Sequence, residues 1–154
     1  MWHALFVITN AIALLGWVLL AFFPRKPLTY SAILYLGVAL LCLTYTALMT
    51  GVVAGLIDPN PVGPATDVSF TSIAGIRGLF ASDGGVVIGW THYLAFDLFT
   101  GLWISRDADA KGFGRFAQTV ILYITLMAGP IGLLIWLILR EGGARRYARA
   151  QKAA

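Results

Sequence analysis

Charge and cysteine are both scarce in this chain. Only 12% of its 154 residues are Asp, Glu, Lys or Arg, whereas a soluble domain carries roughly 25%. The single cysteine, Cys42, forms no disulfide within the chain and says nothing about the redox compartment. With only two histidines beside it, the sequence holds no Cys/His zinc cluster. These shortages exclude a soluble domain and a structural zinc site.

Apolar residues are abundant and occur in long uninterrupted blocks. They make up 59% of the chain, and the mean hydropathy is +0.82. Blocks of about 20 such residues predict transmembrane helices. We therefore predict an all-α membrane protein with one domain, residues 1–154, built as a four-transmembrane-helix bundle. The predicted spans are residues 4–23, 29–54, 84–105 and 116–139, followed by a basic tail at 140–154.

A short helix is expected between the second and third spans. Three prolines exclude helix from residues 58–64. The stretch 70–82 that follows is too short to cross a bilayer of roughly 30 Å. We predict that it forms an interfacial or re-entrant helix whose first turn is capped by Thr66 or Asp67.

The ends of the spans, a proline in the fourth span and the basic residues set further expectations. Pro24-Arg25-Lys26 should end the first span, which lacks the features of a signal peptide. Pro130, after Gly129, should kink the fourth span and open space beside it. Four spans would place both termini on one side. Basic residues then number six on that side and five on the other, and the clustered tail favours a cytoplasmic C-terminus.

The third span contains ionisable residues where they are costly. Asp97 lies near its middle, and a charge there costs about 2.5–3.5 kcal/mol, so such residues usually face the interior of a bundle. His92 is offset from Asp97 by about 140° around the helix, so the two would flank a groove. Burial favours the uncharged form of each group. A neutral carboxylic acid donates a proton and a neutral imidazole accepts one, which suits general acid–base chemistry.

Structural roles for these residues are equally compatible with the sequence. Asp97 would then pair with Arg77 or cap a neighbouring helix, and His92 would be a hydrogen-bonded packing residue. Haem held by His3 and His92, or a metal held by His92, Asp83 and Asp97, is weakly supported, because scattered ligands are poor evidence. We expect no cofactor and no metal.

Several short motifs resemble those of one plant and bacterial membrane family. They are Ile73-Ala74-Gly75-Ile76, Leu79-Phe80, Trp90-Thr91-His92, Asp97-Leu98-Phe99, Asp107 and Gly129-Pro130-Ile131-Gly132. The family is that of the abscisic-acid-deficient-type (neoxanthin-synthase-like) proteins, whose plastid members are needed to make neoxanthin from violaxanthin. The resemblance covers about residues 70–135, and its core is Trp-x-His with Asp-Leu-Phe beginning five residues after the histidine.

The resemblance implies a role connected with carotenoids or xanthophylls. In the plant reaction an epoxide opens to an allenic alcohol, which requires protonation of the epoxide oxygen and loss of a ring-proximal proton. For a cofactor-free isomerase of this kind, Asp97 is the expected acid and His92 the base, and Arg77 would orient Asp97 or a substrate oxygen. The residues expected to bind the substrate are Trp90, Tyr93, Phe96, Trp103 and Pro130.

Other functions remain open at the level of the sequence. A scaffold that binds a carotenoid or another isoprenoid without catalysis, or an accessory subunit of a pigment complex, fits the aromatic content equally well. A permease is less favoured, because no ring of pore-lining residues is present. The expected partners are membrane lipid and a carotenoid or other isoprenoid, with no nucleic acid, and a homo-oligomer is possible. Without a plastid transit peptide, the expected location is a bacterial inner membrane.

Overall fold

The first two predicted spans are long helices. The computed structural model describes residues 1–23, 26–63 and 67–153, with side-chain surroundings as far as residue 142. Helix α1 is Trp2–Phe22, and α2 (Pro27–Ala32), η1 (Ile33–Ala39) and α3 (Leu40–Val53) form one continuous helix, η1 being a π-helical turn. Both are long and apolar enough to cross a membrane. The predicted stop signal at Pro24 and Arg25 lies outside the described residues.

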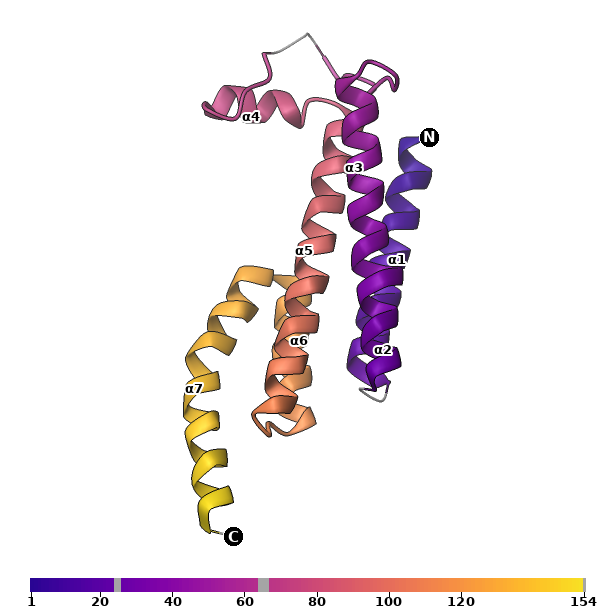
Figure 1. Cartoon of the computed structure of the whole chain (residues 1–154). Helices are drawn as coiled ribbons and strands as arrows, with labels where there is room; N and C mark the ends of the chain where they lie inside the picture. The colour runs from indigo at the N-terminus through magenta and orange to yellow at the C-terminus, as the bar shows by residue number, and fades with distance from the viewer. Residues whose placement is uncertain (24–25, 64–66, 154) are drawn as a thin grey trace.

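The predicted short helix is present as α4, Ile73–Leu79. It extends sideways at one end of the bundle (Figure 1). Its cap is Ser72, whose hydroxyl accepts a hydrogen bond from the Gly75 amide at 3.0 Å, so the predicted cap at Asp67 is wrong. Thr66 lies outside the described residues. Ser72 serves because it is extended directly before the helix, where a side-chain oxygen reaches the free amides of the first turn.

Helix α5, Asp83–Ala110, is the third predicted span and the centre of the fold. The helix continues through residues 106–110, which the sequence predicted to be a connector, and ends where Gly112 adopts a φ of +70°. Leu98 is fully buried between α1 and η1. A Cβ atom added to Gly16 or Gly37 would stand within 3.0 Å of its side chain. These two glycines therefore let both helices pack closely on the middle of α5.

The fourth predicted span is divided into two helices, α6 (Arg115–Met127) and α7 (Gly129–Ala153). They run antiparallel and form a hairpin beside one half of α5 (Figure 1). Ala128, between them, leaves the helical region with φ −155° and ψ 78°. The Phe113 and Trp136 rings, near the open end of the hairpin, meet edge to face at 4.8 Å. The predicted kink is therefore a full reversal of the chain.

This reversal corrects the predicted placement of the termini. The N-terminus of α1 and the C-terminus of α7 lie at opposite ends of the molecule (Figure 1). The expectation that both termini share one side assumed a continuous fourth span. Pro130 in the first turn of α7 has no backbone N–H to continue the α6 hydrogen-bond ladder, so the break at Ala128 is compatible with its local sequence.

Candidate functional site

The side chain of Asp97 lies against the tip of the α6–α7 hairpin. Asp97 is about halfway along α5, and a Cβ atom added to Gly129 would collide with its carboxylate. Gly129 thus allows the carboxylate to approach the first turn of α7. The Oδ2 atom of Asp97 is buried and has no hydrogen-bond partner among the described residues. A buried polar atom without a partner costs about 1–3 kcal/mol, so this one requires an explanation.

Aromatic residues continue the same face of α5. Tyr93, one turn before Asp97, interacts with the Asp97 carboxyl group and with the backbone of Gly129. Trp90 stacks on Tyr93 with ring centroids 5.1 Å apart, and its Nε1 donates to the Asn10 side-chain oxygen at 3.1 Å. Since Trp90 is 39% exposed, this face is open sideways, beside Trp90. The three α5 residues, Trp90, Tyr93 and Asp97, are called the Asp97 face below.

His92 lies on a different side of α5. Its ring is exposed and contacts Phe96 on the same helix, with centroids 4.7 Å apart, and Tyr45 of α3 at 5.5 Å. Across the described residues, no hydrogen bond or ion pair joins His92 to Asp97. The structure therefore brings Tyr93, and not His92, to the carboxyl group. The predicted role of His92 as a base stays a prediction.

The remaining predicted site residues are scattered. Arg77 is exposed on α4, and Asp97 is about 21 Å along α5 from the end that α4 adjoins. Trp103 lies under the Arg140 guanidinium, 5.6 Å from its ring centroid. Phe96 is 58% exposed beside His92. Pro130 follows Gly129 and is exposed at the hairpin tip. Only Pro130 therefore adjoins the Asp97 face.

A second acidic residue of α5, Asp107, fixes the other end of the hairpin. Arg140 of α7 donates to both of its oxygens, at 2.8 and 3.1 Å, and the Trp136 Nε1 donates to Oδ2 at 3.0 Å. Lys111 lies 3.9 Å from Oδ1. The hydrogen bonds from Arg140 hold the pKa of the Asp107 carboxyl below its usual value, outweighing the effect of burial. Arg140 therefore belongs to the folded bundle and not to a free tail.

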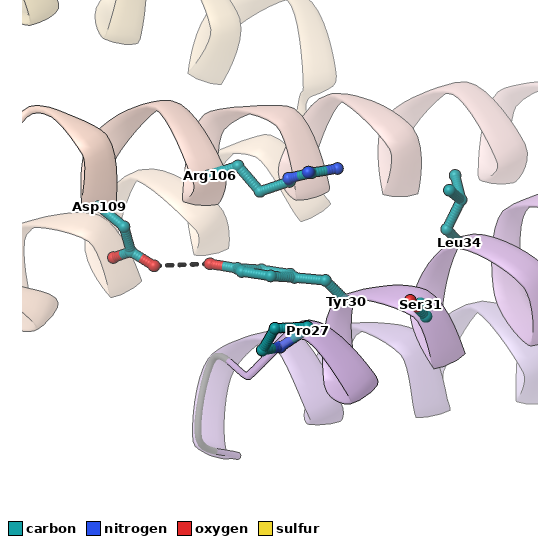
Figure 2. Close-up of a pocket in the computed structure, with 6 residues that line it drawn as sticks. All are labelled: Pro27, Tyr30, Ser31, Leu34, Arg106 and Asp109. Carbon is teal, nitrogen blue, oxygen red and sulfur yellow. Dashed lines mark hydrogen bonds between the residues drawn. The ribbon is translucent and has the colours of Figure 1, made fainter.

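Near Asp107, the side chain of Asp109 connects α5 with α2 and α6. The Tyr30 hydroxyl donates to Asp109 Oδ2 at 2.6 Å, and the amide of the buried Gln118 donates to Oδ1 at 3.0 Å. Figure 2 shows the Tyr30 hydroxyl pointing to Asp109 and the Arg106 side chain above the Tyr30 ring, with its guanidinium carbon 5.7 Å from the ring centroid. An open cavity of about 340 Å³ is lined by Tyr30, Arg106 and Asp109 together with Pro27, Ser31 and Leu34.

The polar residues at this end were not predicted as a cluster. The Asp107 and Lys111 pair, four residues apart, was visible from spacing alone. The pairing of Asp107 with Arg140 depends on the chain reversal and had no local signal. Over the residues that the structure describes, no group of three or more His, Cys, Asp or Glu side chains is placed to hold a metal ion.

The fold and the site define a class: an all-helical protein with two helices apolar enough to cross a membrane and a carboxyl group held halfway along a third long helix. The family model described as ABA DEFICIENT 4-like matches residues 4–136. The chain belongs to this family, which is linked to neoxanthin and xanthophyll biosynthesis. The predicted resemblance is confirmed and extends to α1 and α3. No curated protein and no solved structure matches the chain.

Proposed function

We propose that this protein is a membrane-embedded isomerase of an oxygenated carotenoid end group and that Asp97 is its acid. The proposal rests on the family and on one observation, the buried Oδ2 atom of Asp97, which has no hydrogen-bond partner in the described part of the chain. A substrate oxygen beside this atom would receive the hydrogen bond that the protein does not provide. Tyr93 and Trp90 supply a polar hydroxyl and a stacking surface at the same place.

The chemistry needs no redox cofactor. Protonation of the epoxide oxygen by Asp97 lets one carbon–oxygen bond break, and the oxygen stays on the other carbon as a hydroxyl group. The adjacent chain carbon then loses a proton, and its electron pair forms the second double bond of an allene. The Asp97 carboxylate left by the first step takes this proton, so the acid is restored and the product is an isomer of the substrate. This scheme uses one carboxyl group in both roles.

The arrangement in the membrane follows from the helix lengths. We propose that α1, the helix Pro27–Val53 and α5 cross the bilayer, and that the α6–α7 hairpin enters it from one side. This places Asp97 near the middle of the membrane. A carotenoid is about as long as the hydrocarbon core is thick, so it would approach the Asp97 face through the lipid.

The distribution of charge supports one orientation. Basic residues gather at the end of the bundle to which the hairpin opens, where α2 and α6 begin and α5 ends: Lys26, Arg106, Lys111, Arg115 and Arg140. The sequence of α7 adds four more basic residues after Arg140. Arg77 on α4 is at the other end. Basic residues favour the cytoplasmic side. We therefore propose that the C-terminal end faces the cytoplasm of a bacterial inner membrane.

A pigment assay in a host that accumulates epoxy-xanthophylls tests the catalytic assignment. Asp97→Asn should lower conversion to the allenic product by about a hundredfold or more, as expected for loss of a general acid. Asp67→Asn, in an exposed loop, is the matched control and should convert like the unmodified protein. His92→Ala should retain conversion, because its ring lies away from Asp97. Full conversion by Asp97→Asn would overturn the proposal.

A carotenoid-binding scaffold without catalysis is the second candidate. The observation that favours it is the separation of His92 from Asp97. Among the described residues, Tyr93 is the one titratable side chain that interacts with the Asp97 carboxyl group. An absorption spectrum of the purified protein distinguishes the two functions. Bound pigment in both the unmodified protein and Asp97→Asn, with no conversion by either, would establish the scaffold.

A further inference from the structure

One line of residues along α5 passes from α4 to the hairpin tip. Gly89, Tyr93 and Asp97 are four residues apart, so they lie above one another on the same side of the helix. Each end of this line is covered by another element. At Asp97 the cover is Gly129 of α7, as described above. At Gly89 it is Phe80, and an added Cβ atom would stand 2.5 Å from the Cε1 atom of that ring.

The backbone around Phe80 is firmly connected to α5. Phe80 caps the C-terminus of α4, and its amide donates to the Arg77 carbonyl at 3.1 Å. Ala81 accepts a hydrogen bond from the Val62 amide at 2.9 Å, and the Ser82 hydroxyl caps the first turn of α5. A Cβ atom on Gly85 would collide with the Leu79 carbonyl, so α4 and α5 are in close contact. The residues before and after Phe80 in the chain are therefore both fixed, and they hold its ring against Gly89.

We infer that Phe80 closes the α4 end of the Asp97 face and so limits which part of a ligand reaches the carboxyl group. The inference rests on the proposed function. From Gly89 to Asp97 the helix rises about 12 Å, which accommodates one cyclic end group. A whole carotenoid, nearly as long as the roughly 30 Å hydrocarbon core, does not fit between the two covers. The polyene must leave sideways into lipid, past the exposed Trp90.

Carbodiimide labelling tests this closure without any requirement for turnover. Dicyclohexylcarbodiimide partitions into apolar sites and adds to carboxylic acids, and mass spectrometry of peptides locates the adduct. In the full-length protein in detergent, Phe80→Ala should raise the labelling rate of Asp97 severalfold. Phe80→Tyr, which keeps the ring, should label at the unmodified rate. Ile73→Ala, an exposed apolar residue of the same helix, is the matched control and should also leave the rate unchanged.

A second variant reaches the same contact from the other helix. Gly89→Ala places a methyl group where the Phe80 ring now lies, so the ring must move and the labelling rate should rise as in Phe80→Ala. An unchanged rate in both variants would overturn the inference. If the rates rise but no pigment is converted by the unmodified protein, the closure stands and the isomerase proposal fails.

Discussion

Two aspartates of α5, ten residues apart, have opposite surroundings. Asp107 receives hydrogen bonds from Arg140 and Trp136 and has Lys111 nearby, so its charge is fully compensated. Asp97 has one buried oxygen without any partner among the described residues. A compensated carboxylate fixes structure, whereas an uncompensated one in an apolar setting is kept at a cost to stability. The difference indicates that Asp107 holds the hairpin in place, and it supports the proposal that Asp97 contacts a ligand.

The largest effect on stability is expected when each of the two aspartates is replaced by leucine in a separate variant. Asp97→Leu removes an unpartnered polar atom and should stabilise the protein by about 1–3 kcal/mol, while it abolishes pigment conversion. Asp107→Leu leaves Arg140 and Trp136 without their acceptor and should destabilise it. Thermal unfolding in detergent, followed by circular dichroism, measures both. Changes of the same sign would show that the two carboxyl groups are not different in kind.

The approach of Gly129 to Asp97 is expected to matter next. Gly129→Ala pushes the carboxylate aside, and a displacement of about 1 Å at a reacting group lowers conversion by up to about a hundredfold. Gly142→Ala, on the same helix with open space around it, is the matched control and should have no effect. Pigment conversion per folded molecule is the measurement. Equal conversion by the two variants would show that the hairpin tip is not part of the site.

Acid should act on the Asp107 end of the molecule. The pKa of Asp107 is lowered from 3.8 in the folded protein, mainly by its hydrogen bonds to Arg140. Its contribution to stability is therefore fully present above 3.8 and is lost as the pH falls through the lower, folded value. The unfolding temperature should drop in this acidic range, and Asp107→Asn should have a smaller drop than the unmodified protein. Parallel pH profiles of the two would contradict the assignment.

The smallest effect is expected at Trp90, on the open side of the Asp97 face. Trp90→Phe keeps an aromatic ring next to Tyr93 but loses the hydrogen bond to Asn10, which is worth about 0.5–1.5 kcal/mol. Trp136→Phe, in which a fully buried indole loses its bond to Asp107, should reduce the unfolding temperature more. Unfolding measured for both variants checks this order. A larger loss in Trp90→Phe would mean that Asn10 and Trp90 fix the structure and do not merely border a binding surface.

Local features of the sequence predicted much of this protein. The apolar blocks predicted the helices Trp2–Phe22 and Pro27–Val53 within a few residues, because hydrophobic length is a property of each segment. The 100° advance per residue placed His92 and Asp97 on different sides of the third span, and in the structure the His92 ring lies against Tyr45 and Phe96, away from Asp97. The short helix before α5 was also predicted, although the capping residue was not.

The sequence by itself determined the two helices that form the first two predicted spans, the short helix before α5, the family and the position of a carboxyl group near the middle of α5. Only the tertiary structure decided that the chain reverses at Ala128, that Gly129 meets Asp97 and that Arg140 pairs with Asp107. Gly-Pro permits either a kink or a reversal. The reversal is favoured by contacts with α5 between residues that are 32 and 33 positions apart in the chain. The energy of such contacts is not encoded in any single segment.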